Sequence, residues 1–216
     1  MNCLLAAATS LEINPFLDQY RDDSLFESVS VDVVITGIGL TASTYNLQRQ
    51  IMVKKPDLVI QAGIAGCFDK TFSLGEVLCV KQDTIADLGV VEEKKLKTIF
   101  DLKLAPPNQF PYKKGWLINP NTSLIKKSKL KPVKGISVNQ VTSSGQMIQF
   151  YKEIFQPVLE SMEGAALHYV CLRENIPFLQ IRSISNYAGE RDKKKWNLKE
   201  SIHNLNNGLI RLLDSM

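Results

Sequence analysis

The chain has 216 residues, a hydrophobic content of 44% and a formal net charge of +4 at pH 7. This length fits one substantial α/β domain, and no apolar run approaches the roughly 20 residues of a membrane-spanning helix. The apolar N-terminus has no basic flank and soon meets acidic residues, which favours a buried strand over a signal peptide. We therefore expect a cytoplasmic protein without a membrane partner.

Apolar runs typical of β-strands alternate along the chain with segments of helical periodicity. The expected strands are 3–8, 31–35, 58–62, 77–80, 136–141 and 178–184, and the expected helices are 41–53, 147–155, 162–174 and 198–213. Several strands are almost continuously apolar, which is typical of strands covered on both faces. The alternation predicts a single α/β domain over residues 1–216, with a central mixed, largely parallel β-sheet flanked by helices.

Cysteine and lysine usage limits the classes of partner. The cysteines lie far apart in apolar stretches and form no C-x-x-C pair, which predicts buried reduced thiols and no metal site; they are Cys3, Cys67, Cys79 and Cys171. Lysines gather around residues 94–97, 126–134 and 193–195. No aromatic residues interleave with the central cluster as stacking platforms would, so we interpret the lysines as a solvated face and expect no nucleic-acid partner.

Two glycine-containing turns follow expected strands. Gly37-Ile38-Gly39-Leu40-Thr41-Ala42 formally fits a dinucleotide fingerprint, but its acidic partner, Asp57, would precede the next strand instead of ending it. We interpret this string as a packing turn. Gly63 lies in Gln61-Ala62-Gly63-Ile64-Ala65-Gly66, where backbone amides can approach a ligand closely; a tight turn required by packing is the alternative.

Two glutamates occupy positions suited to chemistry. Glu12 follows the first expected strand and precedes Asn14-Pro15, a helix-start signal. A carboxylate at the carboxyl end of a strand lies where open α/β sheets bind ligands, although an ordinary surface glutamate is the alternative. Glu163, in Ser161-Met162-Glu163-Gly164-Ala165-Ala166, could accept two hydrogen bonds from a cis-diol or serve as an N-terminal acid of a helix.

These strings, together with Arg182-Ser183-Ile184-Ser185-Asn186, resemble the superfamily of purine nucleoside phosphorylases and methylthioadenosine/S-adenosylhomocysteine nucleosidases. The resemblance implies an enzyme that takes a purine nucleoside, uses no metal or organic cofactor, and forms a homo-oligomer, with a homodimer as the first expectation. It implies that Glu12 accepts a proton from the attacking water. It places Gly63 beside the ribose, Met162 under the sugar and Glu163 on the ribose hydroxyls.

Asn186 stands where the second string usually ends in Asp. An amide donates one hydrogen bond and accepts another but cannot transfer a proton, which suits O6 and N7–H of a departing 6-oxopurine. With Gly189-Glu190-Arg191-Asp192 and Trp196, this departure looks most like the futalosine hydrolases of menaquinone biosynthesis. We expect Asn186 to act in catalysis, and we expect hydrolysis of futalosine to hypoxanthine and dehypoxanthine futalosine.

Three further residues are assigned to substrate binding. By analogy with the superfamily, Met147 and Ile148 could sandwich the base, and Arg191 with Trp196 suits the carboxyphenyl group of futalosine, although an internal Arg191–Asp192 pair is an equal alternative. A methylthioadenosine/S-adenosylhomocysteine nucleosidase is the nearest rival. A phosphorylase is disfavoured because the residues around Gly63 offer no charge to phosphate. A non-enzymatic nucleotide-binding module remains a further alternative.

Overall fold

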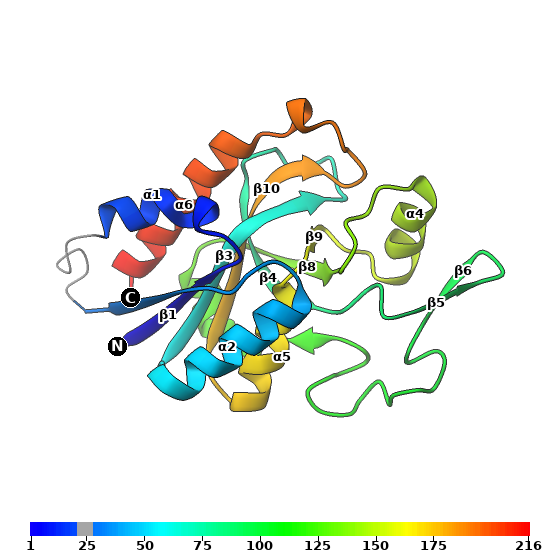
Figure 1. Ribbon diagram of the computed structural model, residues 1–216, viewed down its shortest axis with the longest axis horizontal. Helices are drawn as coiled ribbons and strands as arrows, with labels where there is room; N and C mark the ends of the chain where they lie inside the picture. Colours follow the sequence, from blue (N-terminus) through cyan, green and yellow to red (C-terminus); the bar gives the residue numbers. More distant parts are fainter. Residues whose placement is uncertain (21–27) are drawn as a thin grey trace.

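An eight-stranded mixed sheet runs through the centre of the molecule with helices packed on both of its sides (Figure 1). The computed structural model describes residues 1–20 and 28–216. The strands of this sheet are β1 (Asn2–Ala7), β2 (Ser30–Ile35), β3 (Leu58–Cys67), β4 (Val77–Asp83), β7 (Leu117–Ile118), β8 (Lys131–Ser137), β9 (Leu159–Ser161) and β10 (Phe178–Tyr187). Strands β5 (Gly89–Glu92) and β6 (Lys95–Thr98) pair only with each other among the described residues.

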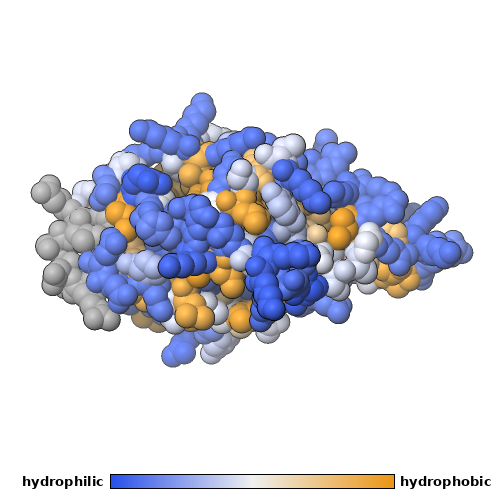
Figure 2. Space-filling view, turned by 90° about the horizontal axis from the view of Figure 1, so that it is seen from above, coloured by the Kyte–Doolittle hydropathy of each residue, from blue (hydrophilic) through white to orange (hydrophobic). Residues whose placement is uncertain are grey.

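Six α-helices are present in the described part of the chain. They are α1 (Ser10–Gln19), α2 (Leu40–Lys54), α3 (Thr122–Lys127), α4 (Gly145–Ile154), α5 (Gly164–Glu174) and α6 (Leu198–Asp214), and a short 3-10 helix η1 (Lys193–Lys195) precedes α6. None of the described helices is both long enough and apolar enough to cross a membrane. The face of the molecule shown in Figure 2 is mostly hydrophilic, and its hydrophobic areas are scattered.

The sheet follows the order β10-β4-β8-β9-β3-β1-β2, and β10 also pairs with β3. The pairings therefore close a circuit through β3, β10, β4, β8 and β9, from which β1 and β2 extend. Strands β1, β2, β3 and β10 run parallel to their neighbours in this group, whereas β10 with β4 and β3 with β9 are antiparallel. The predicted fold class, a mixed and largely parallel sheet flanked by helices, is confirmed.

Alternation along β1 explains the two helical layers. Cys3, Leu5 and Ala7 face the cluster that contains residues of α1 and α6, whereas Leu4 and Ala6 face the cluster that contains residues of α2 and α5. Successive side chains of a strand point to opposite faces, so a continuously apolar strand is buried on both. All four cysteines are buried and free, as predicted.

Several element bounds differ from those expected. Helix α1 begins at Ser10, after the N-cap Thr9, so Glu12 lies in its first turn and Pro15 lies inside the helix instead of marking its start. Strand β8 covers 131–137 instead of 136–141, because its pairing with β4 and β9 sets its position. Strand β3 continues through Gly63 and Gly66 to Cys67, so the expected turn is in fact strand, held by pairing with β10.

Candidate active site

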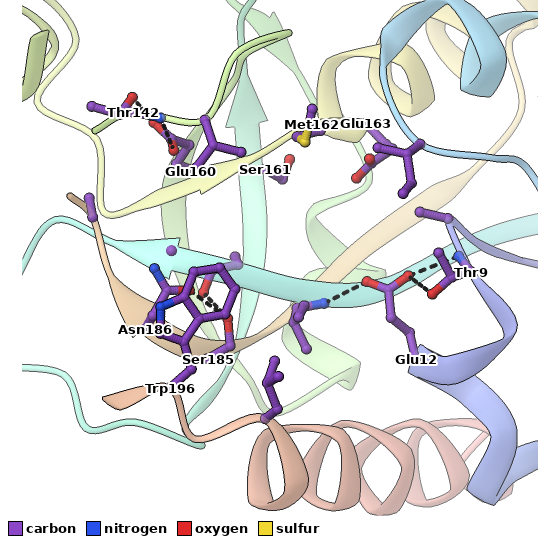
Figure 3. A pocket seen from close by; sticks show the side chains of 18 of the residues that line it. Thr9, Glu12, Thr142, Glu160, Ser161, Met162, Glu163, Ser185, Asn186 and Trp196 are labelled. Atoms are coloured by element: carbon purple, nitrogen blue, oxygen red, sulfur yellow. Dashed lines mark hydrogen bonds between the residues drawn. The ribbon is translucent and has the colours of Figure 1, made fainter. Parts of the chain in front are cut away.

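A cavity of about 370 Å³ opens where β1, β3 and β10 end (Figure 3). This volume is within the usual range of small-molecule sites. Its wall contains four of the residues predicted from the sequence, which are Glu12, Met162, Glu163 and Asn186. They come from chain segments up to 174 residues apart, counted from position 12 to position 186. The carboxyl ends of parallel strands are therefore the site-forming edge of the sheet, as open α/β folds require.

Glu12 is held at the end of β1 by three donors. The backbone N–H and the hydroxyl of Thr9 donate to Oε2 at 3.0 and 3.3 Å, and the N–H of Ile64 donates to Oε1 at 3.1 Å. The Thr9 contact is the acidic half of a capping box, in which the third helical residue reaches back to the N-cap. A carboxylate has about four acceptor sites, so Glu12 keeps capacity for a further donor in the cavity.

Glu163 is the N-cap residue of α5 and is almost fully buried. The N–H of Gly39 donates to its Oε1 at 3.1 Å, and Arg182 Nη2 lies 3.8 Å from its Oε2. Burial raises the pKa of Glu163, and the charge of Arg182 partly opposes that rise. Gly39 has a φ of +91°, a conformation that favours glycine. The Gly37-Ile38-Gly39 turn thus fixes the carboxylate of Glu163.

Arg182 lies behind the cavity wall, between the two glutamates, and sequence reasoning did not assign it a role. Its side chain is 1% exposed, and Nη2 donates to Gln61 Oε1 at 2.6 Å. A Cβ at Gly63 would lie 2.1 Å from Arg182 Nη1 and 2.9 Å from Glu12 Oε1. Gly63 therefore leaves the space that the guanidinium of Arg182 and the carboxylate of Glu12 occupy on either side of it. The feature of the sequence that could have pointed to Arg182 was an arginine inside an apolar strand.

Asn186 presents its amide in one orientation. Its Nδ2 lies 3.1 Å from the carbonyl oxygen of Tyr187, which can only accept, so Nδ2 faces that carbonyl. The hydroxyl of Ser185 then donates to Oδ1 at 2.8 Å. Each end of the amide retains one unused capacity, a second hydrogen on Nδ2 and a second lone pair on Oδ1. Asn186 can therefore donate and accept simultaneously.

Glu160 is a buried carboxylate in the same wall that sequence reasoning missed. The N–H of Thr142 donates to its Oε1 at 3.0 Å, and the Thr142 hydroxyl donates to its Oε2. Burial raises the pKa of Glu160, while both Thr142 hydrogen bonds lower it. In Figure 3 the Glu160–Thr142 pair and the Glu12–Thr9 pair lie at opposite ends of the cavity. The feature of the sequence that could have pointed to Glu160 was an acidic residue directly after the apolar pair Val158-Leu159.

The other predicted residues do not line the cavity. Gly63 lies behind it, next to Arg182. Met147 and Ile148 pack against the apolar cluster around α4, although Ile148 Cδ1 would be 2.6 Å from a Cβ at Gly189, a wall residue. Arg191 is exposed, and its guanidinium lies 5.8 Å from the ring centroid of Trp196. Trp196 itself lines the cavity, so these positions support its wall from behind or from outside.

The charge of the cavity wall is one-sided. Of the described residues that form it, Glu12, Glu160 and Glu163 are acidic, and none is a lysine or an arginine. The guanidinium of Arg182 is behind the wall and already contacts Gln61 and Glu163. A phosphate dianion would therefore meet like charges without a bidentate cationic partner, the contact by which proteins usually hold phosphate. Neutral ligands that donate hydrogen bonds are better suited to this wall.

Comparisons with known proteins identify the family of the chain. The model of the family described as Phosphorylase superfamily matches residues 25–214. A futalosine hydrolase of Thermus thermophilus is 29% identical over 181 residues, which cover 82% of this chain and 79% of that protein. A 5'-methylthioadenosine/S-adenosylhomocysteine nucleosidase of Buchnera aphidicola is 26% identical over 186 residues, covering 82% and 75% respectively.

The fold is also that of a solved structure. A crystal structure of the 5'-methylthioadenosine/S-adenosylhomocysteine nucleosidase of Helicobacter pylori, with butyl-thio-DADMe-Immucillin-A, superimposes with a TM-score of 0.86. The alignment covers 100% of this chain and 99% of that chain at 21% identity. At 21% identity, this similarity establishes the shared fold alone. The futalosine hydrolase and the nucleosidases share the nucleosidase class but differ in substrate.

Proposed function

The chain belongs to the phosphorylase superfamily, and on this premise we propose that it is a cytoplasmic N-glycosidic hydrolase that cleaves futalosine to hypoxanthine and dehypoxanthine futalosine. The enzyme is of the nucleosidase type. Its place would be in menaquinone biosynthesis, and it would act as a homo-oligomer, in the simplest case a homodimer. Light scattering would check the last point against the 24.2 kDa mass of one chain.

The acidic wall of the cavity is the observation that supports hydrolysis over phosphorolysis. Three glutamates and no cation among the described lining residues disfavour phosphate as the acceptor of the ribosyl group. Water carries no charge, and Glu12 has acceptor capacity for its proton. General base catalysis of this kind typically supplies about 10²–10⁴-fold in rate. Water would attack C1′, give a proton to Glu12 and break the bond to N9, whose electron pair leaves with the purine.

Glu163 and Asn186 supply the remaining interactions. Glu163 is fixed by Gly39 and has the second carboxylate oxygen available for a ribose hydroxyl, the role implied by the resemblance. Asn186 would donate through Nδ2 to O6, and its Oδ1 would accept N7–H once solvent water has protonated the departing purine anion at N7, using the two capacities that its neighbours leave free. A preorganised contact to developing charge is worth about 3 kcal/mol in comparable roles. This donor-acceptor pair favours a 6-oxopurine.

The 5′ side of futalosine carries an aromatic carboxylate, and Trp196 offers an aromatic surface in the cavity wall. Its indole N–H donates to the carbonyl of Glu190 at 3.0 Å, so the ring is held in place while its face can pack against another ring. Arg191, over the Trp196 ring, is the nearby cation that would attract the carboxylate. Met162 would pack under the sugar, and Met147 and Ile148 would support the base site from behind the wall.

The test is hypoxanthine release from futalosine in phosphate-free buffer, followed by chromatography of the base. We expect release without phosphate, no stimulation on adding phosphate, and loss of activity in Glu163→Ala. Methylthioadenosine is the comparison substrate. Adenine release from methylthioadenosine that exceeds hypoxanthine release from futalosine would favour the nucleosidase alternative, and strict dependence on phosphate would favour a phosphorylase.

A further inference from the structure

We propose that Glu160 is a specificity residue that accepts a hydrogen bond from N1–H of a 6-oxopurine, on the edge next to the one contacted by Asn186, so that O6 lies between the two contacts. Only the class of base in this proposal rests on the proposed function. Glu160 and Asn186 pair with the same residue, Gly66, from its two sides: Glu160 on β9 and Asn186 on β10. Directly paired residues of neighbouring strands project toward the same face of a sheet.

The spacing suits a purine. Neighbouring strands lie about 4.8 Å apart, so the backbones of β9 and β10 are separated by about 10 Å across Gly66. Gly66 has no side chain to fill this gap, and a Cβ there would lie 3.5 Å from Asn186 Nδ2. All three residues line the cavity. A flat base can thus lie over Gly66 with one polar edge toward Asn186 and the other toward Glu160.

The chemistry of Glu160 selects the base. Both oxygens accept from Thr142, through its N–H and its hydroxyl, which orients the carboxyl group and leaves acceptor capacity toward the cavity. N1 of a 6-oxopurine carries a hydrogen and is a donor, whereas N1 of a 6-aminopurine is an acceptor. A 6-aminopurine would therefore set its N1 lone pair against the oxygens of Glu160. Buried polar groups that lose their partner in this way discriminate strongly between ligands.

A purely structural role for Glu160 makes a different prediction. Its two hydrogen bonds to Thr142 could serve only to hold the loop after β8. In that case a change at Glu160 would lower stability and weaken all bases by the same factor. The decisive readout is therefore the ratio of affinities between bases, since a uniform loss leaves that ratio unchanged.

The first experiment uses the unmodified protein and free bases, measured by calorimetry or by inhibition. Hypoxanthine, 1-methylhypoxanthine and adenine serve as probes. Because 1-methylhypoxanthine keeps O6 and N7 but lacks N1–H, we expect it to bind at least about tenfold more weakly than hypoxanthine. Adenine should also bind more weakly. A loss of twofold or less on N1 methylation would overturn the proposal without any variant.

The second experiment repeats the series in Glu160→Gln. A glutamine amide can also donate to N1 of adenine, so the preference for hypoxanthine over adenine should shrink by at least about tenfold. Thr142→Val, which removes one hydrogen bond to Glu160, should shrink it less and serves if the first variant does not fold. Equal losses for hypoxanthine and adenine would overturn the proposal. Glu153→Gln, a matched change at an exposed helical position, should leave every affinity unchanged.

Asn186→Ala separates the two edges of the base. It should reduce the preference for hypoxanthine over adenine but preserve the penalty on 1-methylhypoxanthine, because N1 faces Glu160. Free bases lack the sugar and its 5′ group, so this series does not depend on futalosine being the substrate. If the protein shows the N1-methyl penalty but does not cleave futalosine, the proposed function fails and the role of Glu160 stands. Futalosine cleavage without the penalty would support the proposed function and overturn the role of Glu160.

Discussion

At the scale of single residues, the orientation of the Asn186 amide decides what the base end of the cavity can recognise. Nδ2 faces the carbonyl of Tyr187 at 3.1 Å, and Oδ1 receives the Ser185 hydroxyl at 2.8 Å. An ionised aspartate would set an oxygen against the Tyr187 carbonyl, where both atoms are acceptors. The local backbone therefore suits an amide, and the departure from the superfamily's usual Asp has a structural basis in this chain.

We predict that Asn186→Asp lowers kcat/KM for futalosine more than kcat/KM for its 6-amino analogue. The introduced carboxylate loses the donor to O6 and opposes it with like charge, whereas an amino group can donate to it. We expect the ratio of the two kcat/KM values to change by at least about tenfold, and a tenfold change corresponds to about 1.4 kcal/mol. Steady-state kinetics with both substrates measures this ratio. Equal losses of kcat/KM on both substrates would show that Asn186 does not discriminate between the 6-oxo and the 6-amino base.

At the scale of elements, strand β3 carries the site through its glycines. Gly63 leaves space for Arg182 and Glu12, and Gly66 leaves space between Asn186 and Glu160. Both lie within β3 and neither has a positive φ, so the close approach of neighbouring side chains explains the two glycines, and an unusual backbone conformation does not. The expected turn at Gln61-Ala62-Gly63-Ile64-Ala65-Gly66 was wrong as local structure, because pairing with β10 continues the strand.

We predict that Gly63→Ala lowers kcat/KM by about 10²-fold or more, because its Cβ would meet Arg182 Nη1 at 2.1 Å and Glu12 Oε1 at 2.9 Å, displacing the guanidinium from Glu163 and crowding the Glu12 carboxylate. The protein should still fold, since the far end of a side chain can shift. Gly145→Ala is the matched control, because nothing lies within 4 Å of a Cβ there. Activity of Gly63→Ala close to that of Gly145→Ala would contradict this role of Gly63.

Element bounds were predicted unevenly. The strands that became β1, β2, β3, β4 and β10 were found because each contains a predominantly apolar run rich in β-forming residues. Strand β8 was shifted by the polar pattern of Lys131-Pro132-Val133-Lys134, and β9 was not predicted because it has three residues. Short strands of this kind depend on their partners for their existence. Glu160 was therefore missed together with the strand that positions it.

At the scale of the whole molecule, a cluster of buried polar side chains lies behind the site. Asp83 and His168 are fully buried, and Gly164 allows Asp83 Oδ2 and Gln180 Nε2 to approach, since a Cβ there would be 2.2 Å from each. Burial raises the pKa of Asp83 from its ordinary 3.8 to about 6 and lowers the pKa of His168 from 6.5 to about 4. The neutral forms of both groups are thus favoured by folding.

These two pKa shifts have opposite effects on stability. Between pH 4 and 6 the folded state holds more protons at Asp83 than the unfolded state, so the contribution of Asp83 to stability falls as pH rises. Between pH 4 and 6.5 the folded state holds fewer protons at His168, so its contribution rises with pH. The two contributions largely oppose each other in the unmodified protein over this range.

We predict that replacing either Asp83 or His168 reveals the pH dependence of stability that the other residue contributes. In Asp83→Asn the free energy of unfolding should rise more steeply between pH 4 and 6 than in the unmodified protein, and in His168→Gln it should rise less or fall. Urea denaturation at several pH values in this range measures both slopes, with Glu153→Gln as an exposed control. Slopes displaced in the same direction in both variants would refute the assignment.

The sequence by itself determined the fold class and the alternation of strands and helices, because apolar runs are local properties, and its resemblance to the superfamily supplied the candidates Glu12, Met162, Glu163 and Asn186. Only the tertiary structure decided that Arg182 lies between the two glutamates and that Glu160 and Asn186 flank Gly66. These contacts depend on strand register and on closure of the sheet. Neither leaves a periodic pattern along the chain, since each joins residues from distant segments.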